Sequence, residues 1–344
     1  MIELKRDELV FSFPEVHHSA SMRISFERTI RIPDDDKDYP LPPALGKFPL
    51  RHVDDLASNV PAEWLKHGGV VFPMYQSEAM WLYFDAHYDV ERDASYPFAI
   101  KIATGKVNAV SGGKWTKGIR RSPRQDYVVV PKQPWLDGYC VAEGVIRQFV
   151  AMPLGSGYSA EEQVSGKAEH GGLQIEVFPM KAAHFEKYNP KRDWRSRGGV
   201  LYEGDPVICC YESAMGLAPG GSMKQKIEKD PYNMGDWDTT HSSRCFAHIT
   251  NSMVWHGITG EHPPHPPPTA KEYNAAGFPW FEWYDEKSNP LTGSKTLSGL
   301  KSVSAIGKNE KQKPLPENES IEPANTVVLH PHKKPGQVRE FEEV

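Results

Sequence analysis

Four polar side chains in the segment 126–180 are the first candidates for chemistry: Asp137, Arg147, His170 and Glu176. Carboxylates and imidazoles are groups that enzymes use for acid–base catalysis. Arg147 falls in a run with apolar residues on both faces, so we expect it on a largely buried strand, where it needs an acidic partner. Glu176 on a neighbouring strand is the natural partner, and a structural ion pair is favoured over a catalytic pair.

The segment 241–265 concentrates histidine: His241, His248, His256, His262 and His265. On one strand, His248 and His256 would lie about 26 Å apart at about 3.3 Å per residue. In an extended polyproline segment, His262 and His265 would lie about 9 Å apart at about 3.1 Å per residue. Zinc binds nitrogen at about 2.0–2.1 Å. We therefore predict no metal and no cofactor, although a site completed by a distant ligand such as His170 stays open.

Familiar catalytic and nucleotide-binding motifs are absent from the sequence. There is no Gly-x-Ser-x-Gly sequence and no cysteine in a recognised catalytic context. The Gly-rich segment 216–222 lacks the Lys-Ser/Thr ending of a phosphate-binding loop, and residues 155–157 lack the third glycine of a dinucleotide fingerprint. The four cysteines form no Cys-x-x-Cys pair, so reduced, buried thiols in the cytosol are favoured.

Charge and hydropathy argue against nucleic acid and membrane as partners. A net charge of −5 and a pI near 6.3 create no global field that would attract them. The basic run 114–124 contains Trp115 and could contact a single strand, but a solvated hairpin is favoured there. No run approaches 18 apolar residues, and the N-terminus lacks the apolar core of a signal peptide. We predict a cytoplasmic protein without a membrane span.

Short apolar runs predict the strands that would position these residues. The expected strands are 22–32, 70–74, 79–84, 101–110, 127–130, 145–152, 173–178, 207–211 and 244–256. The run 173–178 alternates, which predicts a half-buried strand, and 244–256 would have one wet face that carries His248 and His256. The pairs Ser159/Glu162 and Thr269/Glu272 are capping boxes that predict two short helices.

Composition predicts the fold class. The chain has 344 residues, of which 30 are proline and 28 glycine, more than the usual share of about 12%. Many turns and few long helices indicate a mostly β protein: an antiparallel, sandwich-like body with a few short helices and an extended C-terminal arm. We place the body at 1–287, with a sub-boundary in the charged loop 181–204, and the polar arm at 288–344, pinned on the body or on a neighbour.

Several segments resemble a family of bacterial and fungal proteins labelled hypothetical. They are Ile-Pro-Asp-Asp at 32–35, Tyr-Pro-Leu-Pro-Pro-Ala-Leu-Gly at 39–46, Gln-Phe-Val-Ala-Met-Pro-Leu-Gly-Ser-Gly-Tyr at 148–158 and Gly-Gly-Leu-Gln-Ile-Glu-Val at 171–177. The similarity continues through 269–273 and 300–303 and so spans most of the chain. Some relatives carry a ubiquitin-like domain after the strand that matches 173–178. The resemblance implies that the loop 181–204 is exposed and tolerant, and it assigns no activity or functional residue.

The aromatic run 278–284 suggests a binding function. Trp280, Phe281, Trp283 and Tyr284 would bury against a core or form a patch for a partner. With the proline-rich segment 261–268 and the polar arm, they favour a non-catalytic cytosolic protein that binds itself or another protein. The alternative is a hydrolase or other enzyme with a carboxylate or metal site in the central β region. Binding of a carbohydrate or other small molecule without turnover is a third hypothesis.

Overall fold

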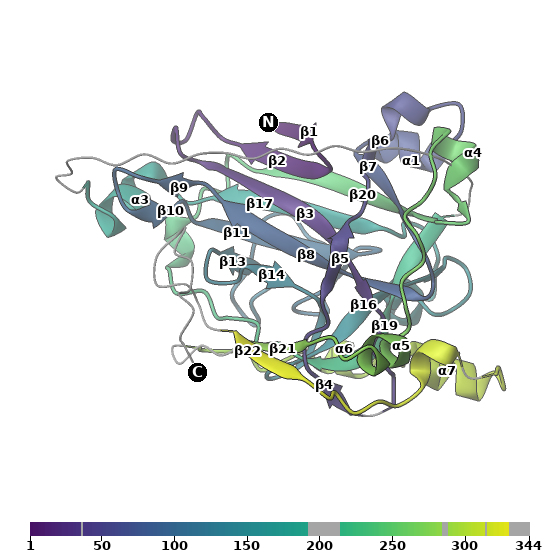
Figure 1. The fold of residues 1–344 in the computed structure, drawn as a ribbon. Coiled ribbons are helices and arrows are strands. Elements are labelled where there is room, and N and C mark those ends of the chain that lie inside the picture. Colours follow the sequence, from purple (N-terminus) through teal and green to yellow (C-terminus); the bar gives the residue numbers. More distant parts are fainter. Residues whose placement is uncertain (36, 192–213, 284–287, 314, 330–344) are drawn as a thin grey trace.

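The computed structural model describes residues 1–35, 37–191, 214–283, 288–313 and 315–329. One large sheet, mainly antiparallel, forms the body, and two small two-stranded sheets accompany it (Figure 1). Within the described residues, no helix is long and apolar enough to cross a bilayer. The prediction of a mostly β, antiparallel, sandwich-like body with short helices is confirmed.

One half of the large sheet carries the N-terminal strands. The strand β3 (Ser21–Ile30) pairs with β2 (Glu8–Ser12) on one side and with β8 (Glu78–Ala86) on the other. The ladder continues from β8 to β16 (Val145–Pro153) and from β16 to β19 (Ala214–Lys224). All these pairs are antiparallel. Antiparallel strands that follow one another in the chain can be joined by short turns.

The other half is built on β17 (Leu173–Pro179). This strand lies between β11 (Phe98–Thr104) and β20 (Ser243–Asn251). On its other edge, β20 pairs in parallel with β7 (Val70–Met74). Beyond the end of the β17 ladder, Ile249 and Thr250 of β20 pair antiparallel with β19. The two halves are therefore joined through β19 and β20.

The remaining elements are short. The other strands are β1 (Ile2–Lys5), β4 (Asp38–Tyr39), β5 (Ala44–Lys47), β6 (Arg51–His52), β9 (Tyr88–Asp89), β10 (Ala94–Ser95), β12 (Val107–Asn108), β13 (Val128–Val130), β14 (Trp135–Leu136), β15 (Gly138–Ala142), β21 (Trp280–Trp283) and β22 (Thr326–Leu329). The helices are α1 (Ala62–His67), α2 (Ala160–Ser165), α3 (Ala182–Tyr188), α4 (Trp255–Thr259), α5 (Ala270–Ala275), α6 (Lys295–Ser298) and α7 (Val303–Asn309), with 3₁₀ turns η1 (Asp54–Leu56), η2 (Met234–Asp236) and η3 (Pro316–Asn318).

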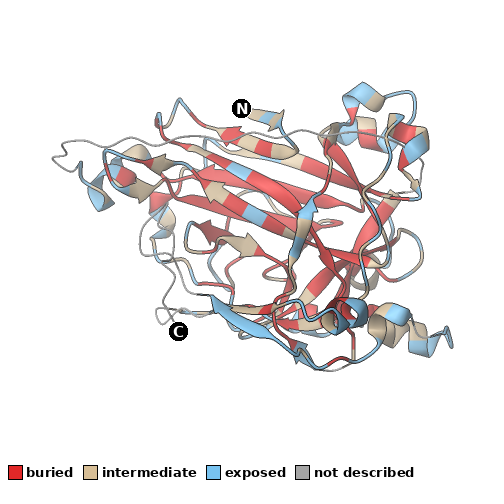
Figure 2. Cartoon of the chain, viewed as in Figure 1, coloured by how far each residue is buried: buried red, intermediate tan, exposed pale blue. Residues whose placement is uncertain are grey.

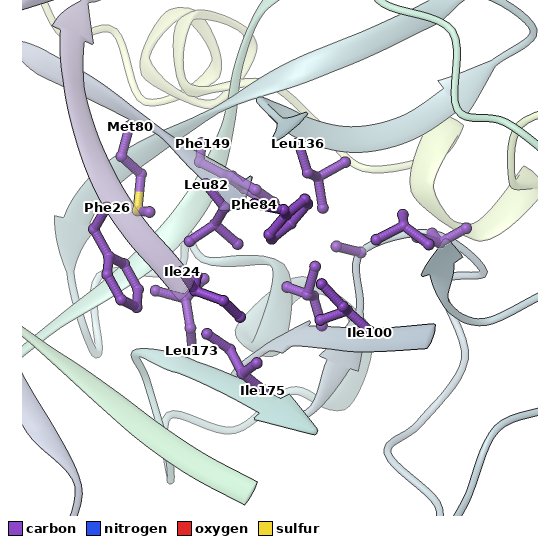
Figure 3. Packing of buried hydrophobic residues seen from close by; sticks show 14 of the residues in the cluster. Ile24, Phe26, Met80, Leu82, Phe84, Ile100, Leu136, Phe149, Leu173 and Ile175 are labelled. Carbon is purple, nitrogen blue, oxygen red and sulfur yellow. The ribbon is translucent and has the colours of Figure 1, made fainter. Parts of the chain in front are cut away.

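The core lies between the two halves of the sheet. Apolar side chains of β3 and β8 pack there with those of β11 and β17, and buried residues run along these strands (Figure 2). Figure 3 labels Ile24, Phe26, Met80, Leu82, Phe84, Ile100, Leu136, Phe149, Leu173 and Ile175. Each such side chain contributes about 1.5–3 kcal/mol when it is fully buried, so this cluster is the main source of stability.

Both predicted capping boxes are confirmed. The hydroxyl of Ser159 accepts the N–H of Glu162 at the start of α2, and Gly166 ends that helix with a left-handed φ of 72°. Thr269 and Glu272 cap α5 in the same way. Local side-chain chemistry was enough to predict these two helices.

Three strand predictions need correction. A turn at residues 105–106 divides the predicted strand 101–110 into β11 and β12, which pair antiparallel. β20 ends at Asn251, so Trp255 does not continue it and instead begins α4. β17 is not half-buried: all seven of its residues are buried. The physical reason is that Gln174 accepts the N–H of Lys106 and Oε1 of Glu176 is held in an ion pair with Arg244, although Oε2 of Glu176 has no hydrogen-bond partner among the described residues.

The Gly-rich segment 216–222 lies inside β19 instead of forming a loop. A Cβ at Gly221 would lie 2.3 Å from the carbonyl oxygen of Pro33, and one at Gly220 would lie 2.4 Å from Val150. Glycine is needed because another backbone and a side chain approach closely there. The predicted strand 207–211 lies outside the described residues, as does most of the loop 181–204, although residues 182–188 form α3.

Candidate functional site

Arg147 and Glu176 do not pair with each other, so that prediction is wrong. Arg147 on β16 lies 3.5 Å from Asp34 and 3.3 Å from the carbonyl oxygen of Gly220. Glu176 on β17 accepts from the Nε of Arg244 at 2.7 Å. The cause is strand order: β16 lies beside β8, β15 and β19, whereas β17 lies between β11 and β20. The register places Glu176 opposite Arg244.

Asp137 lies at the junction of β14 and β15, where its backbone carbonyl oxygen accepts the N–H of Phe149. Its carboxylate is buried, and Oδ2 has no hydrogen-bond partner in the described part of the chain. Burial raises the pKa of Asp137 to about 7. A raised pKa suits a general acid or base, but neither Arg147 nor Glu176, both held in other ion pairs, supplies the second group of a site.

His170 is positioned by a buried carboxylate, that of Glu161. The loop before β17 wraps around Glu161, which accepts the backbone N–H groups of Glu169 (3.1 Å), His170 (2.9 Å) and Gly171 (2.8 Å). The His170 ring packs edge-on to His67 with centroids 6.1 Å apart. Burial lowers the pKa of His170. In the described part of the chain, no ion pair joins any two of the four predicted catalytic residues, and Arg147, Glu176 and His170 are held by other groups.

The predicted wet face of β20 is wrong at His248. Its ring is buried, stacks on Trp64 of α1 at 4.7 Å and on Phe246 at 4.3 Å, and contacts the carbonyl oxygen of Gly68 through Nε2. Burial lowers the pKa of His248 to about 3, so the ring is neutral. Helix α1, distant in sequence, covers this face.

Among the described residues, His17, His18 and Asp89 are the group whose ligand atoms lie within 4.8 Å of one another and could hold a metal ion. Other contacts already occupy one ring nitrogen of His17 and the carboxylate of Asp89. Ser19 donates its N–H to Nδ1 of His17 (3.0 Å) and its hydroxyl to Asp89 (2.8 Å). The Nε of Arg92 lies 3.9 Å from Asp89. Since a metal would have to share these atoms beside a guanidinium, we interpret the group as a hydrogen-bonded junction.

A proline-rich strap, residues 261–268, runs from α4 to α5 along one side of the body (Figure 1). Its backbone carbonyls are bound by the body: the Tyr75 hydroxyl donates to Pro264 (3.0 Å), and Arg28 Nη2 donates to His265 (2.5 Å). At the beginning of the strap, Arg51 forms a two-pronged ion pair with Glu261. Polar contacts therefore hold the strap at three points.

A hollow of about 710 Å³ lies between the strap and the body. It is lined by Asp7, Lys47, Pro49, Arg51, Tyr75, Glu261, His262, Pro263, Pro264, His265 and Pro266. Below the strap, Arg28 also binds Glu78 through Nε (3.1 Å) and Nη2 (2.9 Å). Burial raises the pKa of Glu78 to about 7 even beside this guanidinium. The sequence predicted neither the hollow nor its pairs, because the body residues come from far upstream of the strap.

The predicted aromatic patch is divided between interior and surface. Trp280 is fully buried, which corrects its assignment to an exposed binding surface. Phe281 is partly buried and exchanges two backbone hydrogen bonds with Leu41. Trp283 remains 38% exposed and packs edge-on to Trp135. Tyr284 lies outside the described residues.

Beside this patch lies β22, which sequence analysis missed inside the polar arm. Its four residues, Thr326–Leu329, are all exposed, and the strand pairs in parallel with β21. Val327, Val328 and Leu329 expose 39%, 47% and 39% of their surface. Figure 2 shows the strand exposed along its length. The β-branched run Thr-Val-Val was the available signal, and we name β22 with Trp283 the edge surface.

Comparisons with protein families, with curated proteins and with solved structures give no match to this chain. Its function must therefore be argued from the hollow, the strap and the edge surface.

Proposed function

We propose that this protein is a non-catalytic binding protein that associates with a second copy of itself by pairing strand to strand at β22. The observation that carries the proposal is the exposure of all four residues of this strand, three of them aliphatic. On one side β22 pairs with β21, and within the described part of the chain no strand pairs with its other edge. That edge offers a row of free N–H and C=O groups.

Natural edge strands are normally protected against such pairing. Charged side chains, proline or a β-bulge are the usual protections. Residues 326–329 contain no charge and no proline, and their register against β21 is continuous. Because these four residues lack such protection, we infer that another chain covers this edge of β22 when the protein functions.

A second copy is the partner that fits this edge best. An antiparallel pair of identical strands is self-complementary about a twofold axis, which is the commonest symmetry of soluble oligomers. In such a pair, Val327 and Val328 of one copy would lie across from Val328 and Val327 of the other. Trp283, on the neighbouring strand, would extend the apolar contact.

The expected dimer is weak and reversible. Full burial of an aliphatic side chain contributes about 1.5–3 kcal/mol, whereas association costs at least about 4 kcal/mol in lost freedom. Three half-exposed aliphatic residues on each copy therefore leave only a modest surplus.

The enzyme hypothesis has less support than self-association. The hydrolase hypothesis needs Asp137, Arg147, His170 and Glu176 to converge, whereas Arg147, His170 and Glu176 are held by other partners. For the compartment, our prediction of the cytosol is supported by the free thiols Cys140 and Cys245.

The test is sedimentation velocity of the full chain over a concentration series that reaches the high micromolar range. We expect the mass to rise from the 38.7 kDa monomer toward a dimer. Val328→Lys should abolish the rise, because a charge would be buried at the pair. The matched control is Val90→Lys, at an aliphatic residue 59% exposed away from β22. A monomer at all concentrations, or equal behaviour of both variants, contradicts the proposal.

A further inference from the structure

The strap is bound mainly through its backbone and its one acidic residue. Residues 261–268 contain five prolines, which have no N–H and favour the extended polyproline II form with solvated carbonyls. Tyr75 and Arg28 supply donors to two of those carbonyls. Hydrogen bonds to carbonyls along an extended proline-rich chain, beside an aromatic side chain, are how polyproline-binding domains hold their ligands.

The acidic end of the strap has a matching receptor. Arg51 Nε donates to Glu261 at 2.6 Å, and a second guanidinium nitrogen contacts the other carboxylate oxygen. Such a fork fixes direction as well as position, because guanidinium and carboxylate match in one plane. Asp7 holds the guanidinium in place from the other side through Nη1 at 3.1 Å.

The strap rests on these contacts without becoming part of the core. None of residues 261–268 is buried, and the hollow of about 710 Å³ separates part of the strap from the body. A segment that contributes little apolar burial can leave at low cost, since few packing contacts are lost.

We propose that Arg28, Arg51 and Tyr75 form a polyproline-binding site that the strap fills within its own chain. The ligand class is an extended, proline-rich peptide that begins with an acidic residue, of the form Glu-x-Pro-Pro-x-Pro. The three receptor residues come from β3, β6 and the turn before β8. They lie away from the edge surface in sequence and in sheet, so this site is independent of the proposed dimer.

In the intact chain the strap competes with any external peptide. An attached segment has an effective concentration on the order of millimolar, so an external ligand should bind only weakly. Weakening the acidic anchor in the strap should favour the external peptide, which supplies its own glutamate to Arg51.

The experiment measures fluorescence polarisation of a labelled peptide that copies residues 260–269. The full chain is compared with Glu261→Ala, and a peptide with all prolines replaced by alanine is the ligand control. We expect Glu261→Ala to bind the peptide at least about tenfold more tightly than the unchanged chain, given the effective concentration of the strap. The alanine peptide should bind at least about tenfold more weakly than the proline peptide, because it loses more conformational entropy when it becomes extended.

A second variant tests the receptor. In the Glu261→Ala chain, Tyr75→Phe removes the donor to Pro264 and should weaken the peptide about fivefold, the value of one hydrogen bond. Tyr83→Phe, on β8 with an exposed ring, is the control and should have no effect. No binding to a folded Glu261→Ala chain, or binding that ignores either the prolines or Tyr75, overturns the site. If Glu261→Ala does not fold, Glu261→Gln replaces it under the same criteria.

Discussion

The large sheet and the small β21–β22 sheet place their side chains in opposite ways. Every residue of β11 and β17 is buried, including Lys101 and Glu176. Every residue of β22 is exposed, although the strand carries no charge. Strands β11 and β17 bury charged groups and hold them in ion pairs, whereas β22 presents aliphatic groups to solvent.

The buried charges show how the large sheet works as a scaffold. Lys101 is fully buried, lies 2.9 Å from Asp126 and donates to the carbonyl oxygens of Thr116 and Gly118. This lysine thereby fixes the basic loop to the sheet, which disfavours a nucleic-acid contact through that side chain. A buried ion needs such full satisfaction because desolvation costs several kcal/mol. The comparison therefore assigns a structural role to the buried strands β11 and β17 and a contact role to β22.

The strongest test of this division compares two tryptophans three residues apart. Trp280 is fully buried against Tyr273 and Tyr39, so Trp280→Ala should lower the free energy of unfolding by about 3–5 kcal/mol. Trp283→Ala should cost about 1 kcal/mol or less, because that ring is partly exposed. Urea unfolding followed by circular dichroism measures both. Equal losses would contradict the assignment of Trp280 to structure and Trp283 to contact.

The loop around Glu161 gives a second, smaller effect within the scaffold. Glu161→Gln replaces one acceptor oxygen with an NH₂ group that faces a backbone N–H, so we expect a loss of about 2–3 kcal/mol. Hydrogen exchange at the His170 and Gly171 amides should also become faster. The control, Glu169→Gln, affects an exposed pair with Lys167 and should leave the free energy of unfolding unchanged. A Glu161→Gln protein as stable as the control would show that the three hydrogen bonds are not important.

Local patterns predicted the elements better than they predicted the contacts. The strand β13 and the helix α2 follow from a β-branched run and a capping box that lie within a few residues. The partner of Arg147 is Asp34, which lies 113 residues upstream. No local sequence pattern identifies a partner so far away in the chain.

The same limit explains the errors at His248 and β22. The alternation of apolar and polar residues along β20 predicts a solvent-exposed face for His248. Helix α1, which lies far upstream in the sequence, covers that face instead. The strand β22 was hidden in a polar arm because its ladder forms with β21, some 46 residues earlier in the register. Burial and pairing depend on partners that are distant in sequence, and without homologues to compare, the sequence alone does not identify them.

The last test concerns Asp137, whose Oδ2, like Oε2 of Glu176, has no hydrogen-bond partner within the described residues. Its carboxyl ionises at its ordinary pKa of 3.8 in the unfolded chain but at about 7 in the folded protein. Between these values the unfolded state binds fewer protons, so stability falls as pH rises and is constant above about pH 7. From about pH 5 to about pH 8 the loss is about 2–3 kcal/mol, at 1.36 kcal/mol per unit.

Asp137→Asn should remove this slope, because the amide does not titrate. Urea unfolding at a series of pH values measures the difference between the two proteins, and Asp85→Asn, at an exposed pair with Arg23, serves as the control. If the unchanged chain and Asp137→Asn keep the same pH dependence, Asp137 is ionised in the folded state. A buried and ionised carboxylate of Asp137 would then need a counter-charge or a ligand beside it. That outcome would favour a catalytic or ligand-binding role for Asp137 in the large sheet. Loss of the pH slope in Asp137→Asn would instead indicate that the sheet has a structural role here and buries one neutral carboxyl group.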